Sequence, residues 1–191
     1  MKFYSGSTLR FIHLLGMKKA LTTATLTLLI TYSFAPVALA PVASAARGNS
    51  TPSALAIPAI GLGSPIVPMG LTKAGDLDVP SGTTNNVGWY AKGTVPGEVG
   101  SAVLDAHVFA AFKNLDNVAK GDMIYVAMKD GTTRQFKVTG SKVYKLSELS
   151  GEELFNNNDG RYLHLITCAG ELTADHSTYT HRLVVYATLV K

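Results

Sequence analysis

The chain has 191 residues, a formal charge of +4 and one cysteine. Its lysines and arginines are scattered without a basic run or interleaved aromatic residues, so nucleic-acid binding has no support. A single cysteine excludes an internal disulfide and a metal site made of cysteines alone. It leaves three interpretations of that residue: a nucleophile, a buried thiol or a partner in an intermolecular disulfide.

The first 45 residues have the composition of an export segment. Lys18 and Lys19 precede an apolar stretch, 20–34, and small residues follow it. This pattern predicts that residues 1–45 are an export signal, or an N-terminal membrane anchor if no cleavage occurs. We therefore expect an exported protein, either secreted or held at the extracellular face of the cell membrane. Residues 46–54 have linker composition.

The remaining part, 55–191, alternates between short stretches rich in Val, Ile, Tyr and Thr and clear turn signals. Asp130-Gly131 is the clearest hairpin signal, because this pair supplies the positive φ angles that a tight reversal needs. Many short strands with regular turns favour an all-β closed barrel or sandwich. Two segments, 108–115 and 146–155, are each expected to form one short helix. The expected strands are 55–58, 65–69, 77–79, 88–90, 102–105, 123–128, 133–143, 163–167 and 183–189.

Cys168 is the most informative single residue. It follows directly after the apolar run 162–167. Cysteine is among the most frequently buried residue types, so an inert core thiol is the simplest interpretation. Its place at the end of the run, with the small residues Ala169 and Gly170 behind it, favours an accessible nucleophile instead.

Two other residues are candidate catalytic partners of this thiol, because each lies at the end of an expected strand. His107 follows the expected strand 102–105, and it is either a loop histidine or a proton donor to a leaving amine. Arg182 precedes the expected strand 183–189, and it is either a surface charge or a donor to a developing oxyanion. Thr167, next to the thiol, is either a structural strand residue or part of the oxyanion or substrate site.

The sequence contains no pattern that is typical of a metal or cofactor site. No His-Glu-x-x-His spacing, Gly-x-x-x-x-Gly-Lys loop or dinucleotide-binding glycine pattern occurs. His176 and His181 share a polar loop with Asp175, but their spacing is not that of a zinc site. The acids Glu98, Asp105, Glu171 and Asp175 are candidate calcium ligands by residue type, but they do not form a recognisable binding loop. We therefore predict an enzyme with no metal and no cofactor.

The order of His107, then 165–168 (Leu-Ile-Thr-Cys), then Arg182 resembles the sortase family, the cysteine transpeptidases of bacterial cell surfaces. One departure is Ala106, which stands where sortases usually carry glycine and is tolerated if its φ is negative. Other stretches are similar to the first strands of that family and to its class E and class F members: 57–62, 65–71, and 87–90 together with Pro96-Gly97.

The resemblance implies a closed eight-stranded β-barrel with one or two short helices over 55–191, and a catalytic site of His107, Cys168 and Arg182. Thr167 and Ala169 are candidate substrate-binding or oxyanion residues. We expect the three catalytic side chains to gather at one mouth of the barrel.

The implied reaction cleaves an LPxTG-like sorting signal of a partner protein between Thr and Gly, through a thioacyl intermediate on Cys168. The acyl group then passes to an amine of a cell-wall precursor or a pilin. Two alternatives stay open at this point: another secreted thiol peptidase or L,D-transpeptidase, and a non-catalytic surface-binding β-barrel.

Overall fold

The computed structural model describes residues 50–190. The expected export segment, 1–45, and residues 46–49 of the expected linker lie outside the described residues, so the export segment stays a prediction. Between residues 50 and 190 no helix is long and apolar enough to cross a membrane.

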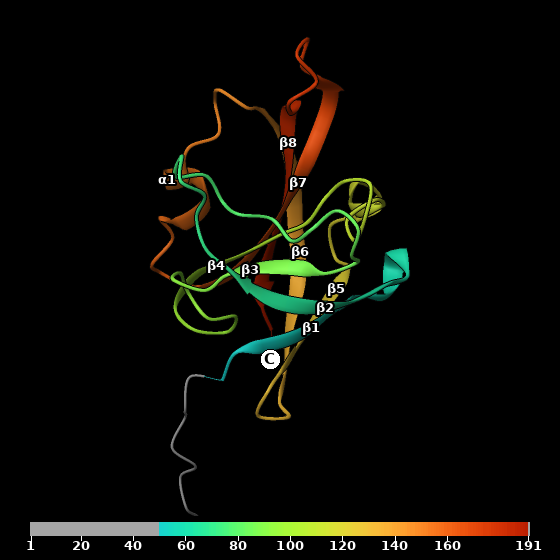
Figure 1. The fold of residues 1–191 in the computed structure, drawn as a ribbon. Coiled ribbons are helices and arrows are strands. Elements are labelled where there is room, and N and C mark those ends of the chain that lie inside the picture. Colours follow the sequence, from blue (N-terminus) through green and yellow to red (C-terminus); the bar gives the residue numbers. More distant parts are fainter. Residues whose placement is uncertain (1–49, 191) are drawn as a thin grey trace, which may run out of the picture. The chain divides into compact units, whose positions relative to one another are not determined.

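The described part of the chain forms one closed barrel of eight strands in the order β1-β2-β3-β4-β7-β8-β6-β5 (Figure 1). This confirms the predicted closed eight-stranded barrel. The strands are β1 (Pro52–Ile57), β2 (Leu62–Met69), β3 (Val87–Tyr90), β4 (Gly100–Asp105), β5 (Met123–Met128), β6 (Thr133–Lys145), β7 (Arg161–Leu172) and β8 (Tyr179–Leu189).

Two strand pairs in the barrel are parallel, β2 with β3 and β4 with β7, and the others are antiparallel. A parallel pair needs a long connection. The segment 70–86 joins β2 to β3, and the chain from 106 to 160 joins β4 to β7. Because β4 and β7 run in the same direction, the residues that follow Asp105 and Ile166 leave the pair on the same side.

The side chains of the barrel strands alternate between two apolar clusters. The larger one fills the interior and includes Leu165 on β7 and Leu183 on β8. Neighbouring residues on the same strands, such as Ile166 and Val184, belong to a smaller cluster on the outer face. We call the second group the outer cluster, and its buried members are Val103, Tyr144, Leu154, Ile166 and Val184.

Several predicted elements differ from the observed ones. β1 begins at Pro52, so the last residues assigned to the linker belong to the first strand. Stretch 77–79 is not a strand, because only an isolated bridge joins Leu71 to Leu77 and Pro80 has no N–H for a ladder. Leu77 packs against the outer cluster instead.

The two predicted helices are shorter than expected. Helix α1 covers only Gly151–Phe155, and the side chain of Ser150 caps it by accepting a hydrogen bond from the N–H of Glu153 at 3.4 Å. Segment 108–115 forms successive turns with bonds between residues three apart, followed by a 3-10 helix at Leu115–Asn117. A second 3-10 helix lies at Pro58–Ile60.

Candidate active site

The three predicted catalytic residues come from neighbouring strands of the barrel. Cys168 on β7 is the Cα partner of Arg182 on β8. The parallel pair β4–β7 ends with Asp105 opposite Ile166. His107 lies two residues after Asp105, just as Cys168 lies two residues after Ile166. The register therefore brings all three residues to the same level of adjacent strands.

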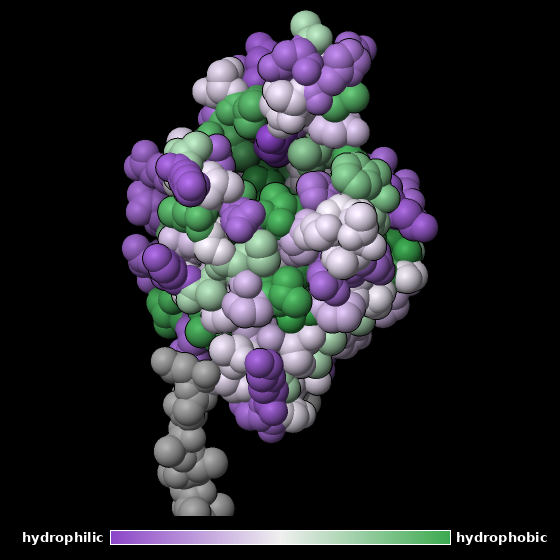
Figure 2. Space-filling model, in the orientation of Figure 1, coloured by the Kyte–Doolittle hydropathy of each residue, from purple (hydrophilic) through white to green (hydrophobic). Residues whose placement is uncertain are grey.

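Alternation along β7 and β8 assigns Cys168 and Arg182 to the outer face of the barrel. Cys168 and Arg182 are each two residues from a member of the outer cluster, Ile166 and Val184, and so share its face. At this level β4 has ended at Asp105, whereas β7 and β8 continue as a hairpin, and the gathering of the three side chains at one mouth of the barrel stays a prediction. Figure 2 shows hydrophobic residues gathered in a hollow between the α1 segment and the β7–β8 hairpin.

Cys168 is a free, half-buried thiol inside a strand. The sequence predicted that β7 ends at Thr167, but pairing with β8 continues to Leu172. The register shifts between Ala169 and Leu172, where Gly170 has a φ of 75°. This irregularity directly follows the thiol, and only glycine adopts such a backbone conformation without strain.

The guanidinium of Arg182 is fixed at the beginning of β8. It donates from Nη1 to the carbonyl oxygens of Tyr179 at 3.0 Å and His181 at 2.9 Å, and from Nη2 to Oγ1 of Thr178 at 2.9 Å. The other N–H groups of this guanidinium have no partner within residues 50–190. They are the ones that a bound substrate can use.

The imidazole of His107 lies against an aromatic ring. Its centroid is 4.7 Å from that of Phe109, and the two planes are inclined by 17°. The carbonyl oxygen of His107 accepts hydrogen bonds from the N–H groups of Ala110 at 3.1 Å and Phe112 at 3.3 Å. These bonds fold the chain back directly after the histidine and so hold it at the end of β4.

The segment between β4 and His107 is tied to β7. The N–H of Ala106 donates to the carbonyl oxygen of Ile166 at 3.3 Å, and Oγ1 of Thr167 donates to the carbonyl oxygen of Ala106 at 2.7 Å. Ala106 is buried in the interior core, and His176 is the only non-glycine residue of 50–190 with a positive φ. The methyl group that replaces the usual glycine therefore causes no backbone strain.

Thr167 and Ala169, the candidate substrate or oxyanion residues, belong to the opposite side of β7. The hydroxyl proton of Thr167 is used in the bond to Ala106, and its side chain is 4% exposed. Ala169 packs against the interior core and is the Cα partner of His181. The hydroxyl of Thr167 is therefore not available to a substrate.

Asp105 is a residue of the site region for which the sequence analysis proposed no catalytic role. Its side chain is 7% exposed, and Oδ2 has no hydrogen-bond partner within residues 50–190. Burial raises the pKa of this carboxyl to about 7, the charge of Asp78 acts in the same direction, and a backbone hydrogen bond opposes them. Gly88 is its Cα partner on β3, and a Cβ at Gly88 would collide with Oδ1. In the sequence, Asp105 stands two residues before His107, and no pattern assigned it a catalytic role.

His164 faces away from the interior leucines of β7, as its alternation with them predicted. It is 1% exposed, its Nδ1 donates to the carbonyl oxygen of Leu154 at 2.9 Å, and its ring meets Tyr186 edge-on at 4.9 Å. Burial lowers the pKa of this histidine, although the bond to Leu154 opposes the effect. The residue fastens the α1 segment to the outer face of β7.

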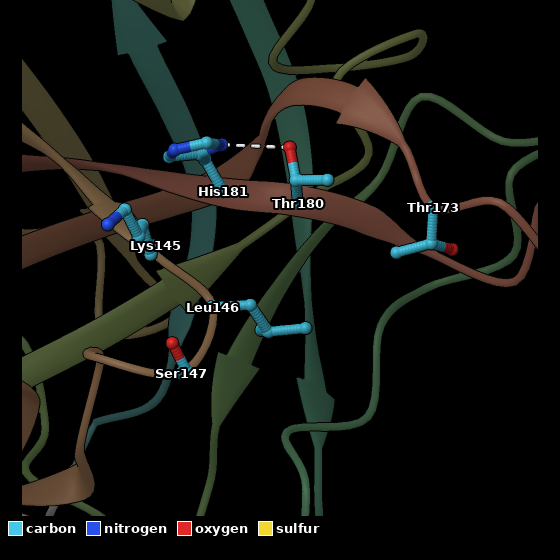
Figure 3. A pocket seen from close by; sticks show the side chains of 6 residues that line it. All are labelled: Lys145, Leu146, Ser147, Thr173, Thr180 and His181. Carbon is cyan, nitrogen blue, oxygen red and sulfur yellow. Dashed lines mark hydrogen bonds between the residues drawn. The ribbon is translucent and has the colours of Figure 1, made fainter.

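A separate hollow of about 460 Å³ lies between the end of β6 and the β7–β8 hairpin (Figure 3). His181 lines it and is paired with Ala169, whose side chain faces away from that of Cys168. Figure 3 shows the hydrogen bond between Thr180 and His181, two of the residues that line this hollow. Cys168 does not line it. Its lining residues are Lys145, Leu146, Ser147, Thr173, Thr180 and His181.

The acids considered for a metal site are dispersed. Glu98 forms an ion pair with Arg161 at 3.9 Å, and the carboxylate of Asp175 accepts hydrogen bonds from Thr173 and Ser177 within its own loop. In the part of the chain that the structure describes, no group of three or more His, Cys, Asp or Glu residues could hold a metal ion.

A comparison with protein families matches residues 55–190 to the sortase domain. The chain belongs to the sortase family. This sortase is a cysteine transpeptidase whose substrates carry sorting signals, as the resemblance implied. The match favours a sortase over the two alternatives, another secreted thiol peptidase or L,D-transpeptidase and a non-catalytic surface-binding barrel. Sortases are membrane-anchored proteins of the extracellular surface. No curated protein matches the chain.

Solved sortase structures are similar to this sortase. Group B Streptococcus Pilus Island 1 Sortase C2 has 26% sequence identity and a TM-score of 0.55, over 73% of each chain. A Clostridium perfringens Sortase D5 transpeptidase has 22% identity and a TM-score of 0.57, over 74% of this chain and 79% of that one. Sortase A from Corynebacterium diphtheriae has 23% identity and a TM-score of 0.56, over 74% of this chain and 61% of that one. The last two show the fold alone.

Proposed function

We propose that Cys168 is the nucleophile of this sortase, that His107 is its general acid and base, and that Arg182 binds the oxyanion or the substrate carbonyl. The observation that supports the proposal is the register of β4, β7 and β8, in which Cys168 is paired with Arg182 and His107 follows β4 beside them. Thiol and imidazole are the groups that acyl transfer through a thioester needs, and a permanently charged guanidinium suits an oxyanion.

The first half of the reaction forms the acyl-enzyme. The thiolate of Cys168 attacks the carbonyl carbon of Thr in an LPxTG-like sorting signal, and the carbonyl oxygen becomes an oxyanion. Arg182 and the backbone N–H groups beside the thiol, including that of Ala169, donate to this oxyanion. The C–N bond to Gly then breaks as the imidazolium of His107 gives its proton to the departing amine.

The second half transfers the acyl group. A primary amine from a cell-wall precursor or a pilin attacks the thioester carbonyl carbon and loses a proton to the neutral imidazole of His107. The C–S bond breaks and the thiolate of Cys168 is restored. The reaction thus proceeds in two steps through a thioester, whose thiolate is a good leaving group, and avoids a direct exchange of one amine for another at the peptide bond.

The setting of this reaction is the extracellular face of the cell membrane or the external medium. The support is the composition of residues 1–45 and the location of sortases in general. We assign the chain to class E or class F because of Val-Gly-Trp-Tyr at 87–90 and Pro96-Gly97. No metal or cofactor takes part in the proposed steps.

The nucleophile assignment predicts that Cys168→Ala abolishes cleavage of an LPxTG peptide and keeps the fold. Mass spectrometry with and without an added amine measures cleavage and transfer, and circular dichroism measures the fold. Val143→Ala, at a residue that is 54% exposed, is the control and should keep full activity. Cleavage at the wild-type rate by the folded Cys168→Ala variant would refute the assignment.

The only cysteine also allows a direct chemical test of the thiol. A methanethiosulfonate probe should add one label to the folded wild-type chain and inactivate it, because Cys168 is half-buried and not sealed. A fully active labelled protein would contradict the role of this thiol.

A further inference from the structure

The ring of His107 lacks the usual support for a catalytic base. When a histidine activates a thiol, a third group commonly orients the base through a hydrogen bond. Within residues 50–190 no side chain or carbonyl group forms a hydrogen bond or ion pair with either ring nitrogen of His107. Without other support, this imidazole would rotate about its side-chain bonds and spend part of its time out of line with Cys168.

Phe109 is the side chain that touches the imidazole. The two rings stack with their centroids 4.7 Å apart and their planes inclined by 17°. Phe109 is 62% exposed, although phenylalanine is usually among the well-buried residues. A ring left in solvent makes little contribution to the core, so its main contact on this side of the molecule is the histidine.

A turn of the segment between β2 and β3 supports this stack from outside. A Cβ at Gly82 would lie 2.9 Å and 3.1 Å from two carbons of the Phe109 ring and 3.5 Å from Cδ2 of His107. The turn is held by Thr84, whose N–H and hydroxyl both donate to the carbonyl oxygen of Ser81, at 3.0 Å and 2.8 Å. Gly82 thus lets a well-defined turn approach both rings closely.

We propose that Phe109, backed by Gly82, is the positioning residue that holds the imidazole of His107 in line for proton transfer. The stack covers one face of the imidazole and leaves its ring nitrogens free for the departing and incoming amines. The inference rests on the proposed role of His107 in the sortase reaction, and it deepens that role by naming what orients the ring.

The kinetic test uses the full-length chain and an LPxTG peptide. Phe109→Ala should lower kcat by about 10- to 100-fold, because a misoriented base loses near-attack geometry, while KM changes by less than about twofold. Phe109→Tyr keeps the ring and should keep kcat. Gly82→Ala keeps the Phe109 side chain but pushes its ring aside, so this variant should also lower kcat. Gly63→Ala is the matched control, since a Cβ there meets nothing within 4 Å.

A spectroscopic readout separates positioning from a general effect on the fold. The imidazole C–H resonances of His107 are observed in protein with isotope-labelled histidine and are assigned by their loss in His107→Gln. The ring current of a stacked aromatic shifts these resonances. Phe109→Ala and Gly82→Ala should both move them, whereas Phe109→Tyr and Gly63→Ala should leave them in place.

The outcomes separate the two proposals. Loss of activity in His107→Gln, with lowered kcat and moved resonances in Phe109→Ala and Gly82→Ala, supports both. Loss in His107→Gln with wild-type kcat in Phe109→Ala overturns the positioning role alone, and so does a Phe109→Tyr variant as impaired as Phe109→Ala. Wild-type activity in His107→Gln overturns the role of His107 and the positioning role with it.

Discussion

Asp105 carries an energetic cost at the edge of the proposed site. Its carboxyl is buried between β3 and the segment that follows β2, and neither neighbouring strand offers it a cation or a donor for Oδ2 within the described residues. A buried, unpartnered carboxyl is held in its neutral form, which agrees with the pKa of about 7. The fold therefore becomes less stable as the solution becomes less acidic.

The sign of this effect gives a prediction for Asp105→Asn. Below pH 3.8 the carboxyl is neutral in both the folded and the unfolded chain, so its ionisation does not affect the free energy of unfolding. Between pH 3.8 and about 7 the carboxyl ionises only in the unfolded chain, so the folded state loses stability as the pH rises. Above pH 7 the deficit is constant, at most about 4 kcal/mol. The variant should gain stability relative to wild type by about 2–4 kcal/mol between pH 4 and pH 8.

Urea unfolding at both pH values measures this gain. Asp116→Asn, at an exposed carboxylate without a hydrogen bond in the described residues, is the matched control and should show no such gain. An Asp105→Asn variant whose stability runs parallel to that of wild type from pH 4 to pH 8 would rule out a buried neutral carboxyl.

At the scale of single residues, the sequence predicted which residues are candidates for catalysis, but it did not predict the side chains that contact them. Cys168, His107 and Arg182 were found from residue type and from their place next to apolar runs. The sequence indicated no role for Phe109 and no catalytic role for Asp105. Phe109 lies close to Gly82 and Asp105 lies close to Gly88, and both glycines are far from these residues in the chain. Such contacts are fixed by the tertiary structure and leave no periodic signal.

The α1 segment is an element whose attachment depends on one buried histidine. Its residue Leu154 packs into the outer cluster, and the carbonyl oxygen of Leu154 accepts the bond from His164 at 2.9 Å. Helix α1 has only five residues and would not be stable alone. The bond and the packing together hold the segment against β7.

This attachment predicts a loss of stability in weak acid. Above pH 6.5, His164 is neutral in both the folded and the unfolded chain. Burial lowers its pKa in the folded chain, so as the pH falls below 6.5 the unfolded chain binds a proton first and the folded state loses stability. His164→Gln should cost about 1–3 kcal/mol at pH 7.5, since it disturbs the bond to Leu154. The gap between wild type and variant should narrow at pH 5.

Thermal unfolding at pH 7.5 and pH 5 measures that gap. His176→Gln, at an exposed histidine of the β7–β8 loop, is the control and should stay close to wild type at both pH values. A gap for His164→Gln that stays constant or widens in acid would contradict a buried neutral imidazole.

Elements were predicted well where turn chemistry and alternation agreed. Stretch 123–128 was predicted with both ends correct, and the Asp130-Gly131 hairpin joins β5 to β6. Stretch 77–79 failed because a short apolar run with prolines and acids around it can pack on a sheet without joining it. Helix 108–115 failed because its apolar residues satisfy a series of tight turns equally well.

For the whole molecule, the all-β class was predictable from local patterns, but the number and order of the strands were not. The parallel pairs β2–β3 and β4–β7 depend on long connections, which local patterns do not encode. The resemblance to sortases supplied the eight strands. The placement of the site on the outer face required the register, because the residues after Thr167 continue the strand.

The barrel interior supports the strands that align the site, so a cavity there should weaken the whole molecule. Leu165 on β7 is fully buried between β4 and β8, and Leu165→Ala should cost about 2–5 kcal/mol. Trp89 is the only tryptophan and is 4% exposed, so its fluorescence reports unfolding in denaturant. Circular dichroism should give the same midpoint, because one core unfolds as a unit.

Val143→Ala should change the stability by at most about 0.5 kcal/mol. A Leu165→Ala variant as stable as Val143→Ala would show that this position does not support the barrel.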